Sequence, residues 1–90
     1  MTEEKSSIPL RGVEPLILSF LNENGRTNQS IRKIGLGIGF SYMVVKKALL
    51  HLEELNCVKR VFEQNRSFLG LSIVPVWAIT EFGRKTLESY

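Results

Sequence analysis

Apolar side chains recur with helical spacing in the first part of the chain and predict two successive helices. The first begins at Pro15, which suits the first turn of a helix, and stops before Asn24 and Gly25; its apolar positions are Leu16, Ile17, Phe20 and Leu21. The second is short, and we expect Thr27 or Asn28 as its N-cap. Glycines at positions 35, 37 and 39 make a continuation beyond about residue 37 unfavourable.

The clearest helix is predicted after Ser41, whose side chain makes it a good N-cap. Its apolar residues fall at i, i+4, i+7 and i+10 and form one continuous stripe: Val45, Leu49, Leu52 and Leu55. Asn56 tolerates the left-handed conformation that often ends a helix, so we expect the helix to stop there.

Two strands and a last helix complete the predicted elements. Residues 57–62 are expected to form a strand, residues 63–67 a polar connection, and residues 71–79 a second strand in which Pro75 favours an edge position. Thr80 is expected to cap a short helix whose Phe82 and Leu87 return to the core. The predicted fold class is therefore α+β and mostly helical, with a two-stranded hairpin before the final helix.

Length and composition indicate one domain. The 90 residues, 43% of them hydrophobic, suffice for a single core. Residues 1–11 are expected to form a polar N-terminal arm and residues 12–90 the domain. No apolar run reaches the roughly 20 residues that span a bilayer, and the acidic start is unlike a signal peptide. We therefore expect a cytoplasmic protein that makes no membrane contact.

The positive charge is concentrated in the middle of the chain. Residues 26–66 carry eight basic and three acidic side chains, hence +5, whereas residues 1–25 carry −2 and residues 67–90 are neutral. Such a block suits a polyanionic partner, although a solvated basic face has the same composition.

Three segments, in order, resemble winged helix-turn-helix transcriptional regulators. Residues 31–49 look like the paired helices of that family, with the small Gly35 where the two helices touch. Residues 52–60 are similar to the helix exit into the wing, with Asn56 in place of the usual glycine and Cys57 in place of an aliphatic residue. Residues 77–85 resemble the last wing strand and the closing helix, where a Thr-x-x-Gly pattern recurs. The resemblance covers roughly residues 12–88 and implies sequence-specific binding to double-stranded DNA.

The helix after Ser41 is expected to enter the major groove, because that groove accepts one helix and is read mainly by its N-terminal part. Its face opposite the apolar stripe carries Tyr42, Met43, Lys46 and Lys47. The lysines can donate to guanine or to phosphates, Tyr42 to a phosphate, and Met43 can contact a thymine methyl group. Further contacts are expected from the N-terminus of that helix, from the second helix and from the wing, namely from Ser41, Arg32, Lys33, Lys59, Arg60 and Arg66. The resemblance implies that Arg66, near the hairpin tip, reaches an adjacent minor groove or a phosphate, with Lys59 and Arg60 in support.

Catalysis is not expected. The chain has no Asp, and its single Cys57 and single His51 are too few for a zinc site, a redox pair or a disulfide within the chain. No cofactor, metal or small-molecule ligand is predicted. Cys57 is interpreted as a small core residue, with an intersubunit cross-link as the alternative if it is exposed, and His51 as a surface residue without a role.

A protein-interaction module is the competing interpretation. Residues 68–76, in the second strand and its approach, are unusually apolar for a wing that touches phosphates, and exposed apolar surface usually marks a partner. That partner can be a second copy, since a two-fold dimer matches DNA half-sites about 34 Å apart. A homodimer is therefore expected as well.

Overall fold

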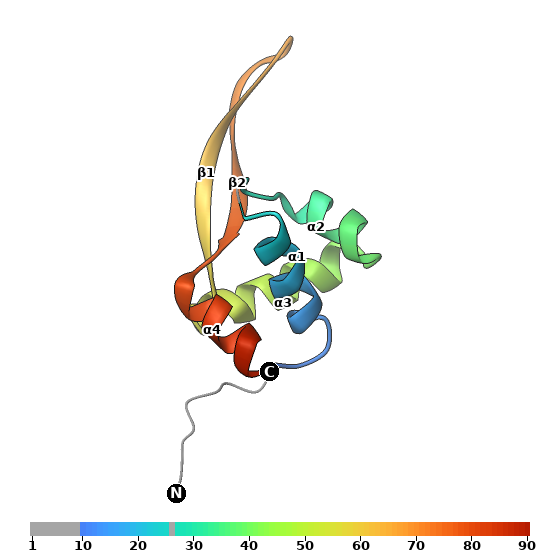
Figure 1. The fold of residues 1–90 in the computed structure, drawn as a ribbon. Helices are drawn as coiled ribbons and strands as arrows, with labels where there is room; N and C mark the ends of the chain where they lie inside the picture. Colours follow the sequence, from blue (N-terminus) through green and yellow to red (C-terminus); the bar gives the residue numbers. More distant parts are fainter. Residues whose placement is uncertain (1–9, 26) are drawn as a thin grey trace, which may run out of the picture.

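The computed structural model describes residues 10–25 and 27–90, and Figure 1 shows a helical body from which a long hairpin rises. The elements follow the order α1 (Glu14–Glu23), α2 (Ile31–Ile38), α3 (Tyr42–Glu54), β1 (Val58–Ser67), β2 (Gly70–Ile79) and α4 (Glu81–Ser89). This order confirms the predicted α+β architecture. The predicted arm, residues 1–11, lies outside the described residues except for Leu10 and Arg11, and Leu10 belongs to the buried core cluster.

The core lies where α1, α2 and α3 meet the base of the hairpin. Its fully buried side chains include the predicted stripe of α3 and the inner face of α1: Val45, Leu49, Leu52, Ile17, Leu18 and Leu21. The hairpin contributes Val58, Trp77 and Ile79 to the same cluster. None of the described helices is long and apolar enough to cross a membrane.

Helix α2 begins and ends later than predicted. Its N-cap is Ser30, whose hydroxyl accepts a hydrogen bond from the Lys33 N–H at 3.2 Å, so the prediction of Thr27 or Asn28 was wrong. The reason is tertiary, because residue 29 forms an antiparallel bridge with Trp77 of β2 and keeps the preceding chain extended. The helix continues through two glycines and stops at Gly39, whose φ of +79° is the left-handed conformation of a helix end.

The other caps follow the prediction. Ser41 accepts a hydrogen bond from the Val44 N–H at 3.4 Å and starts α3, and Thr80 accepts one from the Gly83 N–H at 2.9 Å and starts α4. Asn56 follows α3 with a φ of +63°, as expected for a residue that ends the helix in the left-handed region.

The hairpin is longer than predicted. Pairing runs without interruption from Val58 opposite Ile79 to Ser67 opposite Gly70, so the expected polar connection at residues 63–67 is in fact strand. These polar residues fit a strand because the two-stranded hairpin leaves them exposed. The two residues between β1 and β2, Phe68 and Leu69, form the tip.

Helix α4 packs through small residues. Gly83 and Thr86 are its buried positions, and Leu87 is partly buried against the core as expected. The prediction that Phe82 returns to the core was wrong, since its side chain is 41% exposed. The reason is the close approach of Gly83 to the chain at Cys57, which turns the neighbouring Phe82 outward.

Candidate nucleic-acid interface

Helix α3 presents the predicted face to solvent. Tyr42 and Met43, in its first turn, are 53% and 58% exposed, and Lys46 and Lys47 are exposed in the next turn. The opposite side of the helix is anchored in the core by the fully buried stripe described above. The orientation of α3 therefore leaves its N-terminal half free to meet a partner.

Helix α2 lies against the start of α3 and extends this face. A Cβ atom on Gly35 would lie 2.8 Å from the Phe40 carbonyl oxygen, so the absence of a side chain allows the tight turn between the two helices. Arg32 and Lys33 are exposed, and Arg32 lines a hollow of about 510 Å³ together with Leu36, Phe40 and Tyr42. No ligand pocket was predicted, and this open apolar hollow lies within the face of α2 and α3 itself.

The face of α2 and α3 carries positive charge only. No acidic residue occurs from residue 24 to residue 52, a stretch that contains both helices up to the last turn of α3. Beyond this stretch, Glu53 pairs with Arg60 at 2.9 Å, Glu54 is exposed at the end of α3, and Glu63 accepts a hydrogen bond from Asn28 at 3.0 Å and lines a hollow with Lys33. Arg32, Lys33, Lys46 and Lys47 therefore lie on a part of the two helices that carries no carboxylate.

The middle of the hairpin stands beside this face. Asn65, Val74 and Pro75 line a hollow with Arg32 and Tyr42, and Asn65 also borders a polar hollow with Lys33. Asn65 was missed as a candidate because residues 63–67 were interpreted as a loop. The strand register would have identified Asn65 as a candidate. It places Asn65 opposite Ser72, two positions from Glu63 and on the same face of the sheet.

The predicted wing cations do not form one group. Arg66 is exposed next to the tip, opposite Leu71. Lys59 is exposed at the base of the hairpin, seven positions and about 23 Å along the strand from Arg66. Arg60 pairs with Glu53 and lies over the Trp77 ring, 4.9 Å from its centroid, so its side chain holds the base of the hairpin to α3.

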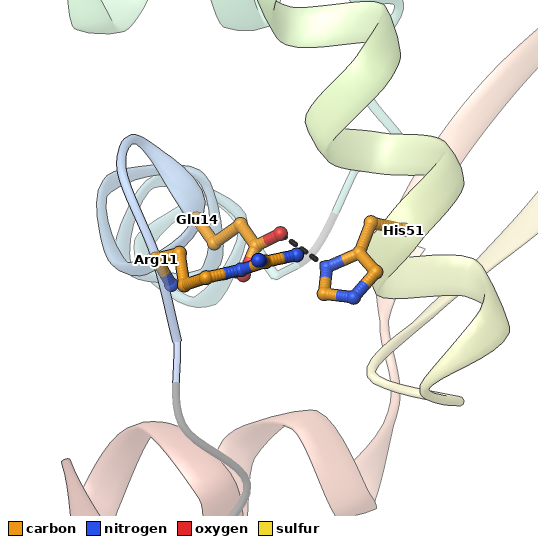
Figure 2. A network of polar contacts seen from close by, with 3 residues as sticks. All are labelled: Arg11, Glu14 and His51. Carbon is orange, nitrogen blue, oxygen red and sulfur yellow. Dashed lines mark hydrogen bonds and ion pairs between the residues drawn. The ribbon is translucent and has the colours of Figure 1, made fainter.

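His51 has a structural partner that the sequence did not reveal. Its Nδ1 lies 2.5 Å from Oε2 of Glu14, whose other oxygen accepts a hydrogen bond from the Arg11 N–H at 3.0 Å (Figure 2). Glu14 is only 4% exposed, so its carboxylate is buried between α1 and α3 and held by these two bonds. His51 is half exposed, as expected, and its contact with Glu14 gives it a structural role that the sequence did not reveal.

Cys57 lies in the core, as expected. Its side chain is fully buried, and burial raises the pKa of the thiol; the nearby Glu14 carboxylate raises it too, while a hydrogen bond with Thr86 works in the opposite direction. A buried thiol is not available for a cross-link between subunits. Across residues 10–25 and 27–90, no three His, Cys, Asp or Glu side chains gather as a metal site would require.

A comparison with protein-family models and one with curated proteins found no match. Solved structures do match. The chain is 15% identical to MepR, a transcription regulator of the Staphylococcus aureus multidrug efflux pump MepA, over 89% of this chain and 54% of that one, with a TM-score of 0.72. In the S. aureus MepR–DNA complex, MepR is also 15% identical to the chain, over 89% of this chain and 60% of that one, with a TM-score of 0.73.

ZitR from Lactococcus lactis, a zinc-responsive MarR family member, is 23% identical over 96% of this chain and 54% of that one, with a TM-score of 0.71. The chain thus spans little more than half the length of these regulators. At this level of identity the likeness concerns the fold. In agreement with the sequence-based prediction, the chain has the winged helix-turn-helix fold found in these transcription regulators.

Proposed function

We propose that the protein binds double-stranded DNA as a transcriptional regulator, with α3 in the major groove and the hairpin as a wing on the adjacent backbone or minor groove. The observation that carries this proposal is the exposed face of α2 and α3, which bears four cations and no carboxylate on a winged-helix fold. A binding role without catalysis agrees with the transcription regulators that share the fold. Such a regulator works where the DNA is, in line with the expected cytoplasmic location.

The geometry of the exposed face suits a duplex. The major groove is about 12 Å wide and admits one helix, and side chains from its N-terminal part reach the base edges. Tyr42, Met43 and Lys46 occupy that part of α3. Lys47 and the α2 cations Arg32 and Lys33 are suited to phosphates, and the Ser41 cap leaves the N-terminus of α3 open to the backbone. We assign Arg60 a structural role in the fold rather than a contact with DNA. Lys59 has only a supporting role in DNA binding.

The test is a titration of labelled mixed-sequence duplex DNA at several salt concentrations. The slope of log K against log salt is about −0.9 per phosphate neutralised, so loss of the Lys47 phosphate contact in Lys46→Ala with Lys47→Ala should make the slope shallower by about 0.9, and loss of both lysines should weaken binding. The matched control removes two exposed cations from α4, Arg84→Ala with Lys85→Ala, which is the same change in net charge. We expect that control to bind almost as well as wild type.

Two outcomes would contradict the proposal. If wild-type protein fails to bind duplex DNA at low salt, the basic face is only a solvated surface and not a DNA-binding site. Equal losses in the α3 and α4 variants would mean that net charge, and not the face of α3, attracts the DNA. Selection of a preferred site from a random duplex pool would then measure whether binding is sequence-specific.

The homodimer remains a prediction. Its support is exposed apolar surface on the first and last helices, where Leu16 of α1 and Phe82 of α4 are each more than one third exposed. A two-fold arrangement would present two α3 helices to successive major grooves about 34 Å apart. Sedimentation of the wild-type chain with and without a duplex measures this directly.

A further inference from the structure

The tip of the hairpin exposes two large apolar side chains to solvent. Phe68 is 96% exposed and Leu69 is 84% exposed, the two highest values among the large hydrophobic residues of the described chain. They lie at the end of the hairpin farthest from the helical body (Figure 1). Such exposure is unfavourable in water and calls for a function at the tip.

Strand pairing and a local hydrogen bond shape the backbone of the tip. Strand pairing continues up to Ser67 and Gly70, the residues that flank the turn. Gly70 has a φ of +121°, which residues other than glycine rarely adopt. The Ser67 hydroxyl accepts a hydrogen bond from the Leu69 N–H at 3.2 Å. The backbone therefore presents Phe68 and Leu69 outward as an apolar wedge.

The surroundings of the wedge suit a polyanion. From residue 64 to residue 80 the chain contains one cation, Arg66, and no acidic residue. Arg66 is exposed two positions before Phe68. An apolar tip with a neighbouring arginine is the combination that minor-groove binding proteins insert between base pairs, where the apolar group unstacks a step and the cation approaches the phosphates.

The spacing between the tip and α3 agrees with a duplex. Asn65, which shares a hollow with Tyr42 of α3, precedes Phe68 by three residues, or about 10 Å of strand. Neighbouring major and minor grooves are separated by half a helical turn, roughly 17 Å. Three residues of strand cover about 10 Å of this separation, and the exposed side chains of Phe68 and Leu69 extend beyond the strand toward the next minor groove.

We propose that Phe68 and Leu69 insert between base pairs in the minor groove next to the α3 site and bend the DNA. This inference rests on the DNA-binding function proposed above and names a contact that the cationic residues do not supply. Pyrimidine–purine steps such as TA unstack most easily, so they are the preferred points of insertion.

The experiment measures DNA bending separately from DNA binding. A duplex that carries a fluorophore at each end and TA steps at regular intervals reports bending by energy transfer, and a 2-aminopurine next to a TA step reports unstacking. The wedge variant is Phe68→Ala with Leu69→Ala. A conservative variant, Phe68→Met with Leu69→Met, keeps an apolar tip, and Phe62→Ala removes a phenylalanine that is exposed within β1, away from the tip.

We expect wild type, the methionine variant and Phe62→Ala to bend and unstack the duplex. The alanine variant should lose both signals, keep the salt dependence of binding and lose about tenfold in affinity, as for the loss of a buried apolar side chain. Fluorescence of the buried Trp77 verifies that each variant is folded.

Two results would overturn the wedge and leave the proposed function standing. The first is wild-type protein that binds DNA without bending or unstacking it, and the second is an alanine variant that bends DNA as well as wild type. In the second case, loss of self-association by the alanine variant, measured by sedimentation, would assign the tip to a contact between copies. If wild type does not bind duplex DNA at all, the proposed function and the wedge both fail.

Discussion

Replacement of Gly83 by alanine should weaken the attachment of α4 to the rest of the fold. A Cβ atom on Gly83 would lie 2.1 Å from the Cys57 carbonyl oxygen and 2.9 Å from the carbonyl carbon. Both obstacles belong to the backbone at the start of β1, so no side chain can rotate to relieve them. Helix α4 must move by about 1 Å to reach even the 3.0–3.4 Å of the tightest ordinary contacts.

That movement disturbs hydrogen bonds at the same corner. The Thr80 N–H donates to the Cys57 carbonyl at 3.0 Å, its hydroxyl donates to the Asn56 carbonyl at 2.6 Å, and the Gly83 N–H donates to that hydroxyl at 2.9 Å. Each bond contributes roughly 0.5–1.5 kcal/mol. Overpacking typically costs about 1–3 kcal/mol, and the higher helix propensity of alanine returns about 1 kcal/mol. We expect a net loss of about 2–4 kcal/mol in the free energy of unfolding.

Urea unfolding followed by Trp77 fluorescence measures this loss, because Trp77 is only 2% exposed and lies at the base of the hairpin. At a slope of about 1–1.5 kcal/mol per molar urea, the midpoint should fall by about 2 M. Gly37→Ala is the matched control, since its Cβ would meet only the half-buried ring of Phe20, which can move aside. A Gly83→Ala variant as stable as wild type, or less affected than Gly37→Ala, would refute the reasoning.

Two further predictions concern buried groups near α3. His51→Ala should lower the free energy of unfolding by about 1–3 kcal/mol at neutral pH, because the buried Glu14 carboxylate then keeps only the Arg11 N–H as a partner. Adding Glu14→Gln to His51→Ala should recover part of this loss. If the losses of the two single variants, measured by urea unfolding, simply add in the double variant, the two residues do not interact and the pairing is contradicted. Burial raises the pKa of the Cys57 thiol above its ordinary value of 9.0. As the pH rises through 9.0, the thiol therefore ionises in the unfolded chain before it ionises in the folded protein, and the folded protein loses stability. Between about pH 8 and 10 the stability of wild type should therefore fall more steeply than that of Cys57→Ala, and parallel pH profiles would exclude the effect.

Local signals explain why much of the fold was predictable from the sequence. The stripe of α3 identifies its buried side, and therefore its exposed side, without knowledge of any other element. Ser41 and Thr80 cap helices through hydrogen bonds to residues three positions later, which are short-range features as well. The predicted face with Tyr42, Met43, Lys46 and Lys47 follows directly from these local rules.

The errors arose where a distant residue decides the local structure. Ser30 caps α2 because residue 29 is held by Trp77, 48 positions away. Residues 63–67 become strand because β2 pairs with them, although their polar side chains have no alternation of buried and exposed positions. The contact of His51 with Glu14 joins residues 37 positions apart, and the position of Asn65 beside Tyr42 depends on how the hairpin packs.

The distance between α3 and the wing is set by contacts away from the candidate interface. The base of β1 is joined to the end of α3 by the pair of Arg60 with Glu53, and to α4 through Thr80. On the other strand, Trp77 exchanges two backbone hydrogen bonds with residue 29, just before α2. Because these connections lie on both strands, the base of the hairpin is expected to keep a fixed position relative to α3. This rigidity is what an apolar wedge requires, since a wing that could swing away would relieve the strain of unstacking without bending the duplex.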